Sequence, residues 1–141
     1  PGGATRRAYD KAGRFIRASD NLKPVLESFG EYMLERIDRR FQFEGLPRRW
    51  APLAASTLAE KQRLGYGNRG ILVRTGRLRR GFRYRATPRT LQLYNNRSSR
   101  GVNLYRVHQF GTNTIPARRM VAYTRVEQQR LTTLLEAHLW D

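Results

Sequence analysis

The feature that most constrains this 141-residue sequence is a long stretch without any acidic residue. The 66 residues between Glu60 and Glu127 contain no Asp or Glu but hold 16 Lys and Arg, of which 15 are Arg. Like charges held close together in a compact fold repel each other unless an external partner compensates them. The sequence therefore indicates a subunit whose basic surface is completed by other macromolecules.

The overall composition is that of a folded domain rather than a disordered basic tail. The net charge of +17 arises from 25 Arg and three Lys, yet two Trp, seven Tyr and six Phe supply material for a core. A length of 141 residues is typical of one domain. Guanidinium groups suit interfaces because they form paired hydrogen bonds with carboxylates and phosphates. GC-rich coding is the non-functional explanation for the same excess of arginine.

The residues that bind metals and cofactors are scarce in this chain. It has no Cys, and its only histidines, His108 and His138, lie 30 positions apart without a close acidic set beside His108. No apolar run reaches the ~18 residues of a membrane span, and the basic beginning lacks the apolar core of a secretory signal. We expect no metal, no cofactor and no membrane association.

The pattern along the chain predicts two regions. Residues 1–20 carry five basic residues and few large apolar ones, which predicts a flexible basic arm, or a short helix that becomes ordered on a partner. A plain frayed terminus is the alternative that gives this segment no role. Residues 21–141 are expected to form a single α+β domain. Apolar residues recur at helical spacing over 22–43, with Pro24 suited to the first turn, so this segment is predicted to be a long helix.

Shorter elements are expected after this helix. The expected order of elements along the chain, with helices first, then strands and then a helix, predicts an α+β fold. In this fold a small antiparallel sheet packs against a long N-terminal helix and a C-terminal helix. Two short helices are expected first, one opened by a Thr57–Glu60 capping box and the other opened by Thr75. They are followed by a hairpin of Arg83–Thr87 and Thr90–Tyr94, an exposed loop over Asn95–Gly101 and a third strand over Leu104–Phe110. A Thr124–Glu127 capping box is expected to open the final helix.

The sequence offers no catalytic residues. The acidic side chains cluster on the first long helix at spacings that a solvated, salt-bridged face explains. No nucleophile elbow accompanies His108, and the glycine-rich segment 65–70 follows a helix rather than a strand, which does not fit a dinucleotide-binding loop. We therefore expect a protein that is not an enzyme.

Nucleic-acid binding is an alternative that the arginines raise. Five of them are interleaved with two aromatic residues that could stack on bases: Arg77, Arg79, Arg80, Arg83 and Arg85, with Phe82 and Tyr84. In a strand, Arg83 and Arg85 share one face and the aromatic residues the other, so a sheet with one apolar and one solvated basic side explains the same pattern. No helix-turn-helix, zinc or RNA-binding signature accompanies it.

A specific string of letters separates these alternatives. Tyr105-Arg-Val-His-Gln-Phe-Gly, followed by Ile115-Pro-Ala-Arg-Arg, resembles the tail-completion or virion-morphogenesis family of tailed bacteriophages. Matches upstream occur in the same order, and together they cover about residues 30–123: Arg40-Phe41, Trp50-Ala-Pro-Leu53, Thr57 with Lys61, and Ile71-Leu72 through Thr75-Gly76-Arg77-Leu78. The chain departs from the family after Arg118, where it reads Arg119-Met120-Val121 in place of Pro-Phe-Leu.

The resemblance implies a structural role at the neck of a virion. Copies would assemble into a homomeric ring, of six subunits by the usual symmetry of such tails, that caps the tail tube and joins it to the head. The implied partners are neighbouring neck and tail proteins, with DNA passing through the ring without sequence-specific binding. The implied location is the virion, and the host cytoplasm during assembly.

We expect eight residues to contact other copies or other virion proteins. They are Arg77, Arg79, Arg80, His108, Gln109, Phe110, Arg118 and Arg119. Arg118 is expected to be exposed, so that it could form a paired contact across an interface. A core position is the alternative for His108 and Phe110, and Trp50 is expected to fill the gap between helix and sheet rather than to bind a partner.

Overall fold

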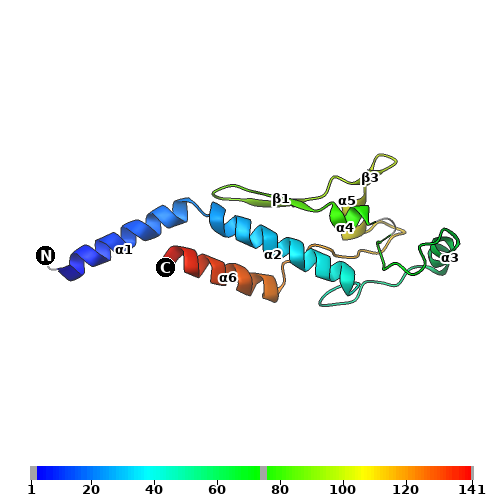
Figure 1. Cartoon of the computed structure of the whole chain (residues 1–141), viewed down its shortest axis with the longest axis horizontal. Coiled ribbons are helices and arrows are strands. Elements are labelled where there is room, and N and C mark those ends of the chain that lie inside the picture. The colour runs from blue at the N-terminus through cyan, green and yellow to red at the C-terminus, as the bar shows by residue number, and fades with distance from the viewer. Residues whose placement is uncertain (1–2, 74–75, 141) are drawn as a thin grey trace. The chain divides into compact units, whose positions relative to one another are not determined.

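A computed structural model describes residues 3–73 and 76–140 (Figure 1). By its contacts the chain divides into two compact units. The first unit contains the residues up to Tyr32, the segment Tyr84–Leu93 and the residues from Tyr123 onward, and the second contains Met33–Arg83 and Tyr94–Ala122. The long helix α2 (Lys23–Gln42) supplies its first ten residues to the first unit and the others to the second.

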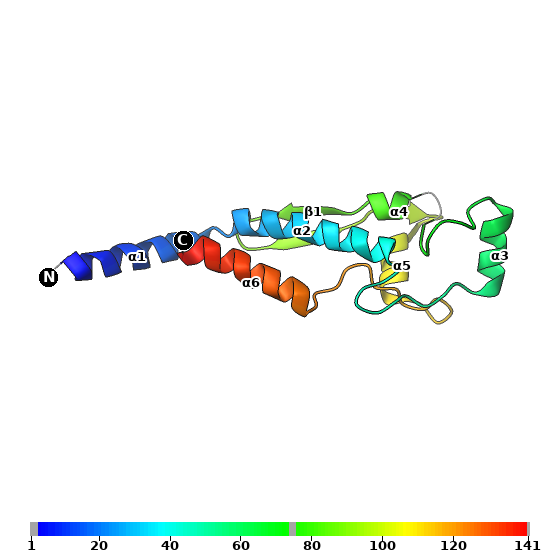
Figure 2. The ribbon, with the colours of Figure 1, turned by 60° about the horizontal axis from the view of Figure 1, so that its bottom comes forward.

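The first unit combines helices with most of a hairpin. Besides the start of α2, its elements are α1 (Gly3–Asp20), most of β1 (Arg83–Ala86) and β2 (Leu91–Tyr94), and α6 (Arg125–Trp140). Figure 2 shows the hairpin running alongside α2. A Cβ added at Gly30 would lie 2.6 Å from the ring of Tyr84, so only glycine lets the hairpin approach the helix this closely.

Helices α1 and α6 contact each other through aromatic and polar side chains. The rings of Phe15 and Trp140 stack with centroids 4.6 Å apart. The Nε2 atom of His138 lies 2.9 Å from the carbonyl oxygen of Ala18 and 2.8 Å from that of Asn21. Residues 3–20 form the helix α1, and the expectation that a helix in this segment becomes ordered on a partner stays a prediction.

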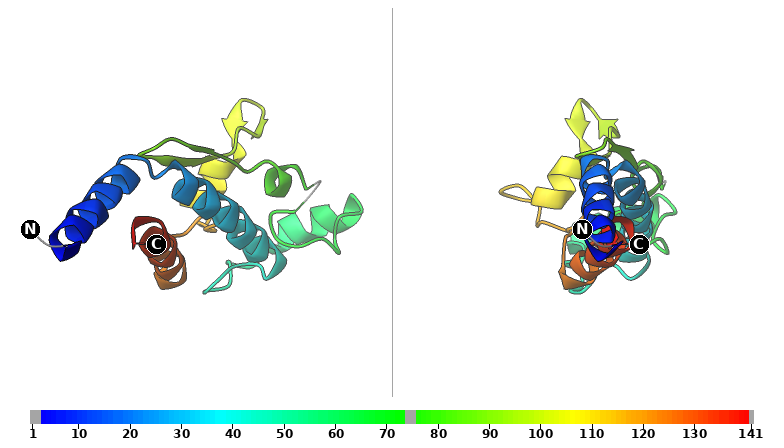
Figure 3. Two further views of the ribbon diagram at one scale, coloured as in Figure 1. Left: turned by 60° about the vertical axis from the view of Figure 1, so that its left-hand side comes forward. Right: turned by 90° about the vertical axis from the view of Figure 1, so that its left-hand side faces the viewer.

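The second unit contains the larger core. Its elements besides the end of α2 are α3 (Ala55–Arg63), α4 (Arg77–Arg80), a short antiparallel hairpin of β3 (Ser98–Ser99) and β4 (Val102–Asn103), and α5 (Leu104–Phe110), which follows β4 directly (Figure 3). In the β3–β4 pair, Ser98 is opposite Asn103 and Ser99 is opposite Val102. The core side chains are Ile37, Phe41, Trp50, Leu78, Phe82 and Met120.

A continuous series of aromatic contacts runs through this core to its surface. The ring of Phe41 lies 5.3 Å from Trp50 and 6.2 Å from Phe82, measured between centroids. Phe82 contacts Tyr105 edge-on at 5.5 Å, and Tyr105 contacts Phe110 at 6.4 Å. Such edge contacts are favoured because aromatic rings are negative on their faces and positive at their edges. The expectation that Trp50 is a core residue is confirmed.

Most sequence-predicted elements are confirmed, and the fold class is α+β as expected. The long helix predicted over 22–43 corresponds to α2, and the predicted hairpin corresponds to β1 and β2. Along β1 the side chains of Arg83 and Arg85 are exposed while Tyr84 is half-buried, as expected for a sheet with one solvated basic face.

The third predicted strand is wrong, because Leu104–Phe110 forms the helix α5. Asn103 begins this helix, since its side-chain oxygen accepts a hydrogen bond of 3.0 Å from the backbone nitrogen of Arg106. Gly111 ends it with a positive φ of 74°. The apolar pattern of this segment fits both a strand and a short helix, and the two capping residues decide for the helix.

One predicted capping box is wrong and one is confirmed. The helix α3 begins after Ala54 and has no side-chain cap, so Thr57 and Glu60 lie inside it. At α6, a side-chain oxygen of Glu127 accepts a hydrogen bond of 3.1 Å from the backbone nitrogen of Thr124 and another from its hydroxyl. Thr75, expected to open α4, lies outside the described residues, and Gly76 precedes the helix.

Candidate assembly surfaces

All eight residues predicted from the sequence to contact partners lie in the second unit. Three of them belong to α4, three to the end of α5, and two to the segment that follows α5. Backbone and side-chain hydrogen bonds join the residues at the end of α5 to those of the segment that follows it. These hydrogen bonds determine which of the side chains are accessible to a partner.

Gln109 is buried and holds the segment after α5 in place. Its side-chain oxygen accepts hydrogen bonds from the backbone nitrogens of Met120 (2.8 Å) and Val121 (3.0 Å), and its Nε2 donates to the Val121 carbonyl oxygen at 2.6 Å. The carbonyl oxygen of His108 accepts from the nitrogen of Arg118 at 2.7 Å. Gln109 therefore has a structural role, since both the oxygen and the nitrogen of its amide form hydrogen bonds within the chain.

Gly111 lets the chain turn tightly between these two segments. Its φ of 74° and ψ of 176° form a conformation that residues with a side chain avoid. A Cβ at this position would lie 2.8 Å from both the nitrogen of Ala117 and the carbonyl oxygen of Ile115. Gly111, which ends the His-Gln-Phe-Gly string, therefore packs directly against the backbone of the Ile-Pro-Ala-Arg string.

Arg118 is buried, with 5% of its surface exposed, so the expectation that it is an exposed side chain is wrong. Its Nε donates to the carbonyl oxygen of Ala51 at 2.9 Å, and a terminal nitrogen donates to that of Pro52 at 3.1 Å. Burial lowers the pKa of Arg118. The adjacent Arg119 has an exposed side chain, and its carbonyl oxygen accepts from Trp50 Nε1 at 2.9 Å.

The arginines of α4 differ in their surroundings. Arg79 Nε forms a 2.6 Å ion pair with Asp38 Oδ1, and this hydrogen bond lowers the pKa of Asp38 and raises that of Arg79. The guanidinium of Arg80 lies over Gly76, where an added Cβ would be 2.4 Å from one of its nitrogens. Arg77 and Arg80 have exposed side chains, so α4 presents cationic groups to solvent.

The remaining two predicted residues lie on different sides of α5. His108 is half-buried and its Nδ1 has no hydrogen-bond partner in the described part of the chain. Burial, with a smaller contribution from the charge of Arg118, lowers the pKa of His108. Phe110 is 69% exposed, and its described ring contact is with Tyr105. Of the predicted residues, Phe110 has the greatest apolar surface open to a partner.

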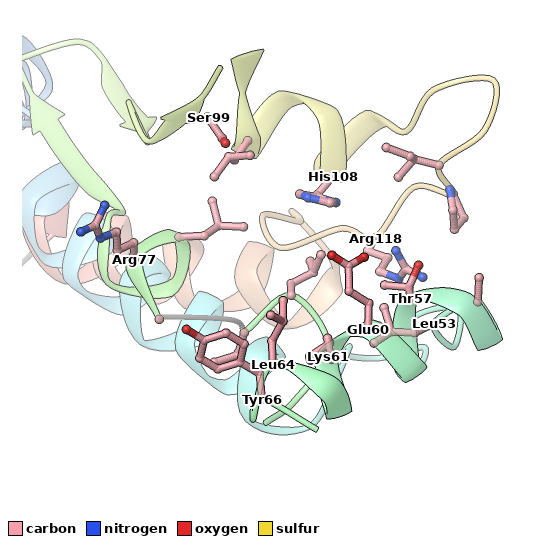
Figure 4. A pocket seen from close by; sticks show the side chains of 18 of the residues that line it. Leu53, Thr57, Glu60, Lys61, Leu64, Tyr66, Arg77, Ser99, His108 and Arg118 are labelled. Carbon is pink, nitrogen blue, oxygen red and sulfur yellow. The ribbon is translucent and has the colours of Figure 1, made fainter. Parts of the chain in front are cut away.

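An apolar pocket of about 710 Å³ lies within the second unit, and sequence reasoning missed it. Figure 4 shows His108 of α5 on one side of the pocket and Glu60 and Lys61 of α3 on the other, with Arg118 beside Thr57 and Glu60. The helix α3 has no buried residue, so its inward side chains are covered only partly. The apolar lining comes mainly from Leu53, Leu64, Leu72, Val73, Leu104 and Ile115.

Sequence reasoning also missed two asparagines that shape this unit. Asn95 is 2% exposed and Ser98–Ser99 form β3, so the expectation of an exposed loop over Asn95–Gly101 is wrong at these positions. The Asn95 side chain donates to the Leu78 carbonyl oxygen at 2.8 Å and accepts from the Arg97 nitrogen at 3.0 Å. Asn103 donates to the Asn95 carbonyl oxygen at 3.1 Å in addition to capping α5. Asn103 directly precedes a seven-residue segment with recurring apolar residues, and Gly111 directly follows it, which is a capping signal that the sequence contains.

The described residues, 3–73 and 76–140, contain neither a candidate membrane span nor a candidate metal site. These residues include no helix long and apolar enough to cross a membrane. They also include no group of three or more His, Cys, Asp or Glu side chains that could hold a metal ion.

The fold and its surfaces define a small α+β protein with a packed aromatic core, an exposed arginine-rich surface and an exposed phenylalanine. A sequence model of the phage virion morphogenesis family matches residues 4–140, and the chain therefore belongs to this family. The family is one of structural and assembly proteins of bacteriophage virions. Searches of curated proteins and of solved structures gave no match.

Proposed function

We propose that this protein is a tail terminator or tail completion subunit, which forms a homomeric ring at the neck and joins the tail tube to the head. The observation that carries the proposal is the surplus of cationic surface. Sixteen basic residues and no acid occupy the stretch between Glu60 and Glu127. Arg79 of this stretch forms an ion pair with Asp38, which lies outside it on α2. A partner that supplies the missing negative charge would relieve their mutual repulsion.

The partners we propose are further copies of the chain and the neighbouring neck and tail proteins, with six copies as the expected ring. Complementary charge speeds and orders the docking of protein surfaces, which suits a subunit that has to dock on neighbouring proteins. No reaction is assigned to the protein. The two buried side chains among the predicted contact residues, Gln109 and Arg118, hold other parts of the same chain.

The proposal is tested by electron microscopy of the purified protein alone and after addition of tail tubes that lack it. Rings at the tube end, together with detection of the chain in purified virions, are the expected result. Salt should weaken this docking strongly, because exposed charges are screened within about 8 Å at physiological ionic strength. A chain that stays monomeric with tubes and is absent from virions would contradict the proposal.

A nucleic-acid-binding module is the second candidate. The exposed side chains of Arg83 and Arg85 on one face of β1 favour it, since such a row could contact phosphates. Affinity for a short duplex, measured at several salt concentrations, separates the two functions. Tight binding of DNA by the monomer would favour the second candidate, whereas weak binding of DNA with salt-sensitive docking on tubes supports the first.

A further inference from the structure

The second unit exposes an aromatic side chain that its own packing leaves uncovered. Among the exposed large apolar side chains of the described residues, Phe110 has the highest exposed fraction, 69%. Its ring is nevertheless restrained on one side, because it contacts Tyr105 and Tyr105 in turn contacts the buried Phe82. A side chain that is restrained before binding loses less conformational freedom when a partner covers it.

The same unit also contains a cavity with the right character to receive such a ring. Its volume of about 710 Å³ lies in the range of pockets that bind organic molecules, and its lining is mostly apolar. One wall is formed by α3, which has no buried residue, and Leu64, directly after this helix, is 38% exposed. An apolar occupant would complete the packing of α3 against the unit.

Phe110 and the pocket lie on opposite sides of α5. Leu104 and His108, one turn apart on this helix, both line the pocket. Phe110 follows His108 by two residues, which places it about 200° further around the helix axis. Phe110 therefore points away from the pocket of its own chain, and a second copy is the natural source of the occupant.

Charge supports the same pairing. Arg106 precedes Phe110 by one helical turn, so the two exposed side chains share one face of α5. Glu60 is exposed on α3, and it is the one acidic residue among the described residues that line the pocket. A Phe110 ring entering the pocket of another copy would bring Arg106 to the wall that carries this carboxylate.

We propose that Phe110 of one copy inserts into the pocket between α3 and α5 of the next copy, with Arg106 pairing with Glu60 across the contact. This inference rests on the proposed function, since it names the contact that would build the ring. The two surfaces are different patches of one chain, and such a head-to-tail contact generates a closed ring when the rotation between copies closes.

The pairing of Arg106 and Glu60 is tested by cysteine cross-linking, for which a chain without native Cys is well suited. Arg106→Cys in one chain and Glu60→Cys in another leave Phe110 and the apolar lining intact. After mixing and treatment with a short bismaleimide, a covalent dimer of the two variants is expected, and neither variant alone should give it. Ala59→Cys, exposed on α3 but outside the pocket lining, is the matched control for Glu60→Cys.

The apolar part of the contact is tested by sedimentation of variants. Phe110→Ala and Leu64→Lys should each weaken ring assembly at least about ten-fold, since each removes a main part of the buried apolar contact. The matched controls are Phe43→Ala and Leu58→Lys, at positions 47% and 40% exposed that do not line the pocket, and they should leave assembly unchanged.

The outcomes separate this inference from the proposed function. Rings that form without the cross-link between positions 60 and 106, and that tolerate Phe110→Ala, would overturn the inference while the proposed function stands. Failure of the unmodified chain to form rings alone or on tail tubes would overturn both. A specific cross-link together with loss of rings in Phe110→Ala and Leu64→Lys supports both.

Discussion

The indole nitrogen of Trp50 donates a hydrogen bond of 2.9 Å to the carbonyl oxygen of Arg119, 69 positions further along the chain. In the opposite direction, the Arg118 side chain donates hydrogen bonds to the carbonyl oxygens of Ala51 and Pro52, the two residues after Trp50. The Trp-Ala-Pro-Leu and Ile-Pro-Ala-Arg strings, far apart in the sequence, are therefore bound directly to each other. Their shared role is to hold the second unit together.

Replacing Trp50 with Phe should lower the free energy of unfolding by about 1–3 kcal/mol. The variant keeps an aromatic ring but removes the donor, which leaves the Arg119 carbonyl oxygen without its described partner. Urea denaturation measures the change. Trp140→Phe, at a position 56% exposed, is the control and should shift stability by at most about 0.5 kcal/mol. Equal effects of the two changes would contradict the assignment of Trp50 to the core.

Replacing Arg118 with Ala should destabilise the monomer by about 2–4 kcal/mol, because two backbone carbonyls lose a charged donor. This effect is opposite to the one expected for an exposed interface residue. Thermal unfolding followed by circular dichroism measures it. Arg119→Ala provides the comparison, since that side chain is exposed and should contribute little. An Arg118→Ala variant as stable as the unmodified protein would show that these hydrogen bonds contribute nothing net.

Replacing Gly111 with Ala should lower stability by more than about 2 kcal/mol, because a Cβ would collide with backbone atoms and the φ of 74° disfavours a side chain. Gly101→Ala is the control for backbone conformation alone. Its φ is 78° but no atom lies near the added Cβ, so the expected loss is only about 1 kcal/mol. Chemical denaturation of the two variants distinguishes collision from conformational strain, and similar losses would rule out the collision.

The stability of the protein should decrease in mild acid because of His108. Its pKa in the folded chain is lowered from 6.5 by burial and by the charge of Arg118, so below about pH 6.5 the unfolded chain binds more protons than the folded chain. The free energy of unfolding contributed by this group is complete above pH 6.5 and is lost as the pH falls toward the lower pKa of the folded state.

The variant His108→Gln should show less of this decrease. Urea denaturation at about pH 7.5 and about pH 5.5, in the unmodified chain and in the variant, measures the difference. The comparison between two pH values within each protein removes any constant effect of the substitution itself. An identical loss of stability in both proteins would show that other groups are responsible for the pH dependence.

The local elements of this fold could be predicted where one pattern dominates. Apolar residues at helical spacing predicted α2. The hydrogen bonds that Thr124 donates to the Glu127 carboxylate at the start of α6 follow from a capping box that the sequence displays. In Leu104–Phe110 the apolar pattern suits a strand and a helix equally. The decision there depends on Asn103 and Gly111, the flanking residues that cap the helix.

The candidate surfaces were harder to predict because they depend on contacts between distant segments. The sequence string marks Arg118 as important, but its burial follows from carbonyl groups 66 and 67 positions away. The pocket has the same origin, since its walls combine α3 with α5 and with the segment around Ile115. Periodicity and composition describe neighbours along the chain and contain no direct information about such pairs.

The placement of Phe110 and His108 on opposite sides of a two-turn helix has a consequence for symmetry. In the proposed ring, the angle between successive copies depends on the rotation that α5 imposes between its two faces. One residue inserted between these positions would turn Phe110 by about 100°. Copies joined at that altered angle would no longer meet after one circuit, and they would grow instead as an open spiral. The number of subunits in the ring would thus depend on the rotation about the α5 axis between His108 and Phe110.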